Sequence, residues 1–268
     1  MPFLKLPDID LHYEIEGDGP PIVLAAGMLS DSASWSSLLD PLAEHFTVIR
    51  PDNRTTGRTT PTNADTSPPK CAKDILALLD HLDLPSAQII GHSMGGYISA
   101  ELAALAPERT ASLTLLCSAP MNLPRSWHLF QTFCDIRASG PEGLWLRSLF
   151  PWLFHHSFFD IPAQVDGAVA ASLAYPYAQS AEAMQHQLNS IIGYDPSPLT
   201  AQIQTPTLGL LAQNDLIVPH RDALDLLTQI PQAQVHTIEH SGHSIHWDAP
   251  GAVLSHLIPF LKEHADDT

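Results

Sequence analysis

One five-residue stretch, Gly91-His92-Ser93-Met94-Gly95, constrains the fold of this chain more than any other feature. It follows a continuous apolar run, residues 87–90, that predicts a buried strand, and it precedes residues 97–106, whose Ala and Leu spacing predicts a helix. A sharp strand-to-helix turn brings neighbouring backbone against positions 91 and 95, where only the hydrogen of a glycine fits. The turn is expected to lift the Ser93 hydroxyl clear of the sheet and to direct the Met94 N–H at the same space.

Strand and helix alternate on both sides of this turn. Residues 3–16 alternate in polarity and predict two antiparallel strands with a turn near Pro7 and Asp8. The other predicted strands are residues 21–26, 46–50, 113–117, 205–211 and 234–238, and the other predicted helices are residues 34–45, 70–82, 219–230 and 250–262. Repeated strand–helix units predict an α/β fold, with a mostly parallel, doubly wound sheet covered by helices on both faces.

Residues 121–200 interrupt this alternation. The segment holds most of the aromatic residues of the chain, and prolines recur along it, for example at positions 124, 141, 151, 162 and 176. Short helices separated by proline fit this composition better than strands. We therefore expect a core formed by residues 1–120 and 201–268, with residues 121–200 inserted as a helical cap over the sheet.

The charge of the chain excludes two classes of partner. Its 12 Lys and Arg against 29 Asp and Glu give a formal net charge of −17, which opposes binding to nucleic acid or to an anionic membrane. No apolar stretch approaches the roughly 20 residues of a membrane span, and the N-terminus lacks the pattern of a signal peptide, so a cytoplasmic protein is expected. The 3 cysteines and 15 histidines fall in no convincing metal or redox spacing. We predict neither a metal nor a cofactor.

Three reactive side chains, Ser93, Asp215 and His243, each follow a predicted strand. The carboxyl ends of parallel strands meet at one edge of a sheet, where ligands bind. A serine hydroxyl becomes a nucleophile when an imidazole removes its proton, and a carboxylate behind the imidazole fixes its tautomer. The order Ser, Asp, His is that of hydrolases built on a Gly-x-Ser-x-Gly nucleophile elbow. Singly, Asp215 could cap the next helix and His243 could be a surface loop histidine; together, the three predict a catalytic triad.

With these residues in view, the chain resembles the α/β-hydrolase superfamily along nearly its whole length, and within it the ester and lactone hydrolases typified by 3-oxoadipate enol-lactonase. The resemblance implies the cap, the triad, and an oxyanion hole made by the N–H groups of Met28 and Met94. It rests on Gly91-His92-Ser93-Met94-Gly95-Gly96, Pro107-Glu108-Arg109, Thr205-Pro206-Thr207, Asn214-Asp215 and Gly242-His243, with Asp248 and Pro250 downstream.

Two stretches depart from the usual pattern of this family. Before the first oxyanion donor the family usually has His-Gly, and this chain has Ala26-Gly27. Where the family commonly has Asp-x-Arg-Gly-x-Gly, the chain has Asp52-Asn53-Arg54-Thr55-Thr56-Gly57, so that Thr55 replaces a glycine. We interpret Asp52 and Arg54 as an internal brace of this loop, with contact between Arg54 and the substrate as the alternative.

These observations predict a serine hydrolase that cleaves a small carboxylic ester or lactone through an acyl-enzyme intermediate. A cofactor-free perhydrolase or acyl transferase would use the same triad, and a ligand receptor without turnover would keep it intact. A homodimer is a further hypothesis.

The predicted cap supplies the candidates for substrate binding, Trp127, Arg147 and Trp152. Arginine suits two-point binding of a carboxylate, and the cap also contains Arg125 and Arg137. Arginines on amphipathic helices more often extend their charged ends into water. We therefore expect a neutral ester as substrate, with a carboxylate-bearing lactone or ester as the alternative.

Overall fold

The computed structural model describes residues 2–265 and 268, and its centre is an eight-stranded sheet with the order β1-β2-β4-β3-β5-β6-β7-β8. β1 pairs antiparallel with β2 and β2 with β4, while every other neighbouring pair is parallel. The mostly parallel sheet is therefore as predicted. The strands are β1 (Phe3–Lys5), β2 (Asp10–Glu16), β3 (Pro21–Ala25), β4 (Thr47–Pro51), β5 (Ala87–His92), β6 (Thr110–Leu116), β7 (Thr207–Ala212) and β8 (Gln234–Ile238).

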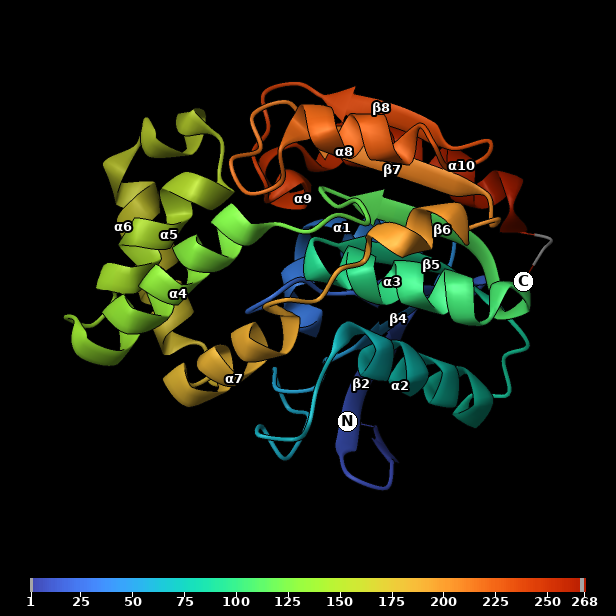
Figure 1. The fold of residues 1–268 in the computed structure, drawn as a ribbon, viewed down its shortest axis with the longest axis horizontal. Helices are drawn as coiled ribbons and strands as arrows, with labels where there is room; N and C mark the ends of the chain where they lie inside the picture. Colours follow the sequence, from blue (N-terminus) through green and yellow to red (C-terminus); the bar gives the residue numbers. More distant parts are fainter. Residues whose placement is uncertain (1, 266–267) are drawn as a thin grey trace.

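Helices cover both faces of the sheet (Figure 1). In β3, Val23 and Ala25 join the hydrophobic cluster beneath α2, α3 and α8, whereas Ile22 and Leu24 join the cluster beneath α1 and α10. Alternate side chains of one strand are thus buried on opposite faces, which explains why β3 is apolar throughout. These helices are α1 (Ser36–Ala43), α2 (Pro68–His81), α3 (Met94–Leu105), α8 (His220–Leu227) and α10 (Pro250–Glu263), and the short α9 (Ile245–Asp248) precedes α10.

Several helix boundaries differ from those predicted; α2 begins at Pro68 rather than Lys70, and α8 ends at Leu227 rather than Ile230. α3 begins at Met94 rather than Tyr97, because Gly95 and Gly96 are helical despite the low helix propensity of glycine. The helix expected over residues 34–45 is divided into a 3-10 helix, η1 (Ser32–Trp35), and α1. The Asp31 carboxylate caps η1 by accepting a hydrogen bond from the Ala33 N–H at 2.9 Å. The division of this helix thus accompanies a capping contact that hydrophobic spacing does not indicate.

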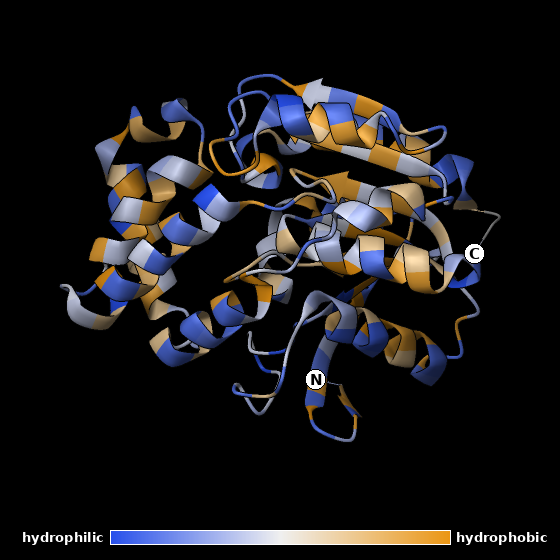
Figure 2. Cartoon of the chain, in the orientation of Figure 1, coloured by the Kyte–Doolittle hydropathy of each residue, from blue (hydrophilic) through white to orange (hydrophobic). Residues whose placement is uncertain are grey.

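The segment between β6 and β7 is helical and lies beyond the carboxyl ends of the strands (Figure 1). It has a small hydrophobic cluster of its own around Leu146, Phe150 and Val169, and its helices mix hydrophobic and hydrophilic residues, unlike the apolar central strands (Figure 2). We retain as a proposal that residues 121–200 act as a cap on a core of residues 1–120 and 201–268. The helices are α4 (Pro124–Ser139), α5 (Leu144–Leu153), η3 (His156–Phe159), α6 (Pro162–Ala174), α7 (Ala181–Ile191) and η4 (Ser197–Ala201).

Within the described residues, no helix combines the length and the apolar character that crossing a membrane requires.

Candidate active site

The turn between β5 and α3 has the steric features expected from its glycines. Ser93 has φ of 54° and ψ of −119°, a backbone conformation that is strained for a residue with a side chain. A Cβ atom on Gly91 would lie 2.2 Å from the carbonyl oxygen of Gly95, and a Cβ atom on Gly95 would lie 2.0 Å from that of Ala25. Any larger residue at either position would therefore force the backbone apart.

The structure brings together the three side chains selected from the sequence. The Nε2 atom of His243 lies 2.9 Å from the Oγ atom of Ser93, and its Nδ1 atom lies 2.9 Å from Oδ2 of Asp215. His243 and Asp215 have side chains only 3% exposed. Because a carboxylate accepts from Nδ1–H, the neutral ring leaves Nε2 free to accept the serine proton.

The second carboxylate oxygen of Asp215 holds the turn that follows β7. Oδ1 accepts hydrogen bonds from the N–H groups of Ile217 and Val218, both at 2.8 Å. Asp215 therefore orders its own loop while it contacts His243, so the two roles considered from the sequence coexist in one side chain.

The two expected oxyanion donors lie next to Ser93. Met94 is the first residue of α3, and Met28 lies in the loop after β3; both residues, with Ser93, line one small hollow. Within the part of the chain that the structure describes, neither backbone N–H donates to a protein acceptor. The N-terminus of a helix also favours negative charge.

The loop that bears Met28 is braced without the histidine that the family usually has there. The Asn53 side chain donates a hydrogen bond to the carbonyl oxygen of Ala26 at 2.9 Å, and Oε1 of Gln187, on α7, accepts one from the Leu29 N–H at 3.0 Å. Gln187 was not identified from the sequence, because a lone glutamine on a helix carries no local signal.

The sequence is similar to known proteins along most of its length. The family model described as the alpha/beta hydrolase fold matches residues 20–250. The chain belongs to the α/β-hydrolase family. It is 30% identical over 270 residues to a putative carbamate hydrolase, RutD, of Azorhizobium caulinodans, an alignment that covers 98% of this chain and 99% of that protein.

Solved structures also share the fold of this α/β-hydrolase. A thermophilic esterase from Thermogutta terrifontis, solved with malate bound, aligns with a TM-score of 0.86 at 25% identity and covers 99% of this chain and 100% of its own. The enol-lactonase from Burkholderia xenovorans LB400 aligns with a TM-score of 0.86 at 22% identity, over 97% of this chain and 100% of its own. The resemblance inferred from the sequence motifs is confirmed at the level of the superfamily, and an enol-lactonase is among the proteins that share the fold.

Two further histidines of this α/β-hydrolase lie beside His243. The rings of His92 and His246 are 4.5 Å apart between centroids, and the rings of His92 and His243 are 5.0 Å apart. Burial lowers the pKa of His92 to about 3, and it lowers the pKa of His246 well below its ordinary value. Both rings are therefore neutral at neutral pH and place no like charge beside His243.

The loop that carries His243 is held by Asp248 of α9. The Oδ2 atom of Asp248 accepts hydrogen bonds from the N–H of Gly242 at 2.7 Å and from the N–H of His155 at 2.9 Å. Burial raises the pKa of this carboxyl group, although both hydrogen bonds act in the opposite direction. Asp248 thus connects the His243 loop to the cap segment.

The loop after β4 is held by its own charged residues. Arg54 forms ion pairs with Asp8 and Asp74, and Asp52 accepts hydrogen bonds from the N–H groups of Ser32 and Arg58 at 2.9 and 2.8 Å. Burial opposes the ionisation of Asp52, but its hydrogen bonds outweigh burial and lower its pKa. These contacts agree with the structural role expected of Asp52 and Arg54. Thr55 has φ of 75°, a value that favours glycine, and its carbonyl oxygen accepts a hydrogen bond from Gln179 at 3.0 Å.

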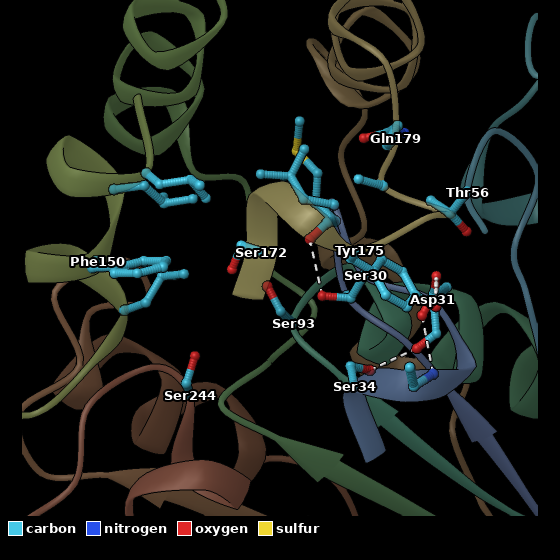
Figure 3. A pocket seen from close by; sticks show the side chains of 18 of the residues that line it. Ser30, Asp31, Ser34, Thr56, Ser93, Phe150, Ser172, Tyr175, Gln179 and Ser244 are labelled. Carbon is cyan, nitrogen blue, oxygen red and sulfur yellow. Dashed lines mark hydrogen bonds between the residues drawn. The ribbon is translucent and has the colours of Figure 1, made fainter. Parts of the chain in front are cut away.

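A cavity of about 390 Å³ lies above Ser93, between the sheet and the cap segment. In Figure 3 the Ser93 hydroxyl points into this space, with Phe150 on one side and the polar residues Asp31 and Gln179 on the other. The Tyr175 hydroxyl donates to Oδ2 of Asp31 at 2.8 Å, and burial raises the pKa of Asp31. The cavity therefore has both an aromatic and a polar wall.

The cap candidates selected from the sequence differ in position. Trp127 lines the small hollow beside Ser93. Arg147 and Trp152 are absent from the described residues that line either space. Arg147 is half exposed and pairs with Asp166 at 2.8 Å, because it lies on the outer side of α5, away from buried Leu146. Trp152 packs against the main hydrophobic cluster.

Arg137 is the cap arginine that reaches the cavity. Its guanidinium lies 4.3 Å from the ring centre of Trp145 and donates a hydrogen bond to the carbonyl oxygen of Gln179. Arg125 instead donates to the carbonyl oxygen of Leu216 at 2.6 Å. Arg137 thus joins α4 to the segment before α7 while it forms part of the cavity wall.

Among the described residues, one group of side chains has metal-ligand geometry: Cys117, Asp215 and His243 offer ligand atoms within 4.8 Å of one another. The Asp215 and His243 atoms are already joined by their hydrogen bond. Burial raises the pKa of the Cys117 thiol well above its ordinary value, whereas a metal requires the thiolate. We therefore assign these side chains to the Ser93 site and not to a metal.

Proposed function

We propose that this α/β-hydrolase is a serine hydrolase that cleaves a small carboxylic ester or lactone through an acyl-enzyme intermediate on Ser93. The observation that carries the proposal is the continuous pair of hydrogen-bond distances, 2.9 Å from Ser93 to His243 and 2.9 Å from His243 to Asp215. A strained serine, a buried imidazole and a buried carboxylate thus lie within hydrogen-bonding distance of one another below a cavity, which is the arrangement that nucleophilic attack by serine requires.

The reaction begins when His243 Nε2 takes the Ser93 proton while Oγ attacks the carbonyl carbon of the substrate. The oxygen of that carbonyl becomes negative and accepts hydrogen bonds from the N–H groups of Met28 and Met94, each worth about 3 kcal/mol of barrier. Nε2 then gives its proton to the leaving oxygen, and the bond between the carbonyl carbon and that oxygen breaks. Water, deprotonated by the same ring, then attacks the acyl carbon; the bond from this carbon to Oγ breaks, His243 returns the proton to Ser93 Oγ, and the acyl group leaves as a carboxylic acid.

The test is labelling with an organophosphonate, followed by steady-state kinetics of Ser93→Ala. We expect one adduct on Ser93 and a fall in kcat of about 10⁴-fold to 10⁶-fold on any ester that the parent turns over. Ser172→Ala, which also removes a serine hydroxyl from the cavity wall, should still be labelled on Ser93 by the organophosphonate. An adduct on another serine, or near-normal turnover by Ser93→Ala, would contradict the proposal.

A carbamate is the second candidate substrate, favoured by the 30% identity to a putative carbamate hydrolase. Its carbonyl would be attacked in the same way and would leave a carbamoyl group on Ser93. Intact-mass measurement after rapid quenching distinguishes this adduct from an acyl group.

Three other activities are compatible with the same residues and are separated by simple assays. A perhydrolase or acyl transferase would pass the acyl group from Ser93 to hydrogen peroxide or to an alcohol faster than to water. A receptor would acquire at most one acyl group per chain. Multiple turnover with water as the acceptor distinguishes the hydrolase from all three.

A further inference from the structure

Ser93 lies between two spaces of very different size. The cavity described above has a volume of about 390 Å³, whereas a second hollow beside Ser93 has a volume of about 10 Å³. Met28, Ser93 and Phe130 line both spaces. A volume of about 10 Å³ is close to that of one water-sized probe. The small hollow therefore has room for a group of about one heavy atom without movement of its walls.

The two spaces lie on different sides of the reacting groups. His243 lines the large cavity, together with Ser244 after it and Trp247 of α9. The described residues around the small hollow include Met94, Tyr97 and Trp127 but not His243. The large cavity is thus on the side of the proposed general base, and the small hollow is on the side of the first turn of α3.

The chemistry of acyl transfer assigns a different half of the substrate to each side. His243 Nε2 must reach the leaving oxygen to protonate it, at about 2.6–3.2 Å. The alcohol half of an ester therefore extends from the carbonyl carbon toward His243 and into the large cavity. The carbonyl oxygen is directed to the N–H groups of Met28 and Met94. The remaining substituent, the acyl chain, is left to face the small hollow.

Building on the proposed serine-hydrolase function, we propose that the preferred substrates are acyclic esters with an acetyl-sized acyl group and a bulky alcohol. The acyl methyl occupies the small hollow, and the alcohol occupies the large cavity. A lactone ring ties the acyl chain to the leaving oxygen, so it cannot be divided between the two spaces in this way. Acetyl esters are therefore preferred over lactones.

The walls of the small hollow resist enlargement. Ile217 and Val218 line it, and their N–H groups bind Oδ1 of Asp215 at 2.8 Å. The Tyr97 hydroxyl donates to the carbonyl oxygen of Met121 at 3.0 Å, and Ile191 is fully buried. Retreat of this wall to admit a longer acyl chain would disturb the carboxylate that orients His243. The residues that limit the length of the acyl chain, Ile217 and Val218, therefore also hold Asp215 in place.

The large cavity suits a bulky alcohol that has apolar and polar parts. Phe150 forms part of one wall, and the hydrogen-bonded pair of Asp31 and Tyr175 forms part of another (Figure 3). Trp145 also lines the cavity. A cavity of several hundred Å³ accommodates a molecule with many more atoms than an acetyl group. The unequal sizes of the two spaces thus match the unequal halves of the proposed substrate.

The experiment varies one half of the ester at a time. The p-nitrophenyl esters of acetate, butyrate and octanoate share a leaving group, and methyl, phenyl and 2-naphthyl acetate share an acyl group. We expect kcat/KM to fall by about tenfold or more from acetate to butyrate and further to octanoate, whereas 2-naphthyl acetate should be cleaved at least as well as phenyl acetate. δ-Valerolactone should have a smaller kcat/KM than phenyl acetate.

A matched pair of variants tests whether the small hollow determines the preference for a short acyl chain. Trp127→Ala enlarges the small hollow and should shift the preference toward butyrate by tenfold or more. Trp145→Ala makes the same substitution in the wall of the large cavity and should leave the ratio of acetate to butyrate unchanged. Circular dichroism of both variants establishes that each is folded.

The outcomes separate this inference from the proposed function. Equal or greater kcat/KM for butyrate and octanoate in the parent, a larger kcat/KM for the lactone, or an acyl preference that Trp127→Ala does not move would overturn the assignment of the two spaces. In each of those cases the acyl adduct on Ser93 would still form, and the hydrolase would stand. Failure of every ester to acylate Ser93 would instead overturn the proposed function and this inference with it.

Discussion

His92 Nε2 donates a hydrogen bond to the backbone carbonyl oxygen of His243 at 2.8 Å. The residue before the proposed nucleophile therefore holds the backbone of the proposed general base, across 151 positions of sequence. A carbonyl oxygen can only accept, so Nε2 carries the proton of the neutral ring. His92 is in this sense a positioning residue, because it acts on the reaction through His243.

Two substitutions of His92 test this role. His92→Leu removes the donor and should lower kcat about 10-fold to 100-fold, the cost of a small misplacement of a catalytic group. His92→Gln keeps an amide N–H at a similar distance from the backbone and should restore most of the activity. Equal loss in both variants would show that the imidazole acts in another way.

Acid stability tests the neutral state of His92. An unfolded histidine gains its proton near pH 6.5, whereas burial holds the pKa of folded His92 at about 3. The unfolded state thus binds more protons between these values, so the stability that is present above pH 6.5 is lost as the pH falls toward 3. This one group should cost about 2 kcal/mol between pH 7.5 and pH 5. Urea unfolding at pH 7.5 and pH 5 measures how far the free energy of unfolding falls between the two pH values. This fall should be smaller in His92→Gln than in the parent by about 2 kcal/mol. An equal fall in both proteins would refute the neutral state of His92.

Asp215→Asn separates the two contacts of that side chain. The amide oxygen can still accept from the N–H groups of Ile217 and Val218, as Oδ1 does now, so the fold should persist. The amide NH₂ would face Nδ1 of His243 and favour the tautomer in which Nε2 carries the proton. kcat should therefore fall by about 10⁴-fold. Parent-like turnover would reduce Asp215 to a cap of its own loop.

Gln187→Ala tests whether α7 supports the loop that bears Met28, the proposed oxyanion donor. Removal of Oε1 leaves the Leu29 N–H without its acceptor and frees the loop that bears Met28. Because an oxyanion forms only in the transition state, kcat should fall about tenfold with little change in KM. Gln185→Ala, on the same helix, removes hydrogen bonds that, within the described part of the chain, join Gln185 to Gln131 and Asn189, and it should behave like the parent. Similar kinetics in both variants would contradict this role.

Two glycine substitutions distinguish steric need from helix propensity. Gly91→Ala would place a Cβ atom 2.2 Å from the carbonyl oxygen of Gly95 and should lower the free energy of unfolding by about 3 kcal/mol or more. A Cβ atom on Gly167, in α6, has no neighbour within 4 Å, so Gly167→Ala should raise it by about 0.5–1 kcal/mol. Chemical denaturation of both proteins measures the difference. A Gly91→Ala protein as stable as the parent would contradict the close approach at the turn.

The sequence alone determined the features that depend on near neighbours along the chain. The Gly-x-Ser-x-Gly pattern of residues 91–95 could be recognised as a strand-to-helix turn, in which Gly91 approaches the carbonyl oxygen of Gly95, and the strand–helix alternation follows from hydrophobic periodicity. The order of Ser93, Asp215 and His243 could be read because each residue follows a strand, and parallel strands end at a common edge. These features predicted the fold and brought the three side chains to one site.

The tertiary structure decided what depends on the packing of distant elements. Arg137 and Arg147 are both arginines on helices of the cap segment, yet Arg137 lines the cavity and half-exposed Arg147 pairs with Asp166. The difference depends on which face of α4 and of α5 is turned toward the cavity. Gln187 accepts a hydrogen bond from the loop that bears Met28, although the two segments are 158 residues apart, and periodicity within α7 does not indicate what its polar face will meet. The unequal hollows beside Ser93 arise in the same way, since their walls come from the elbow, the β7 loop and the cap segment, which become neighbours only when the chain is folded.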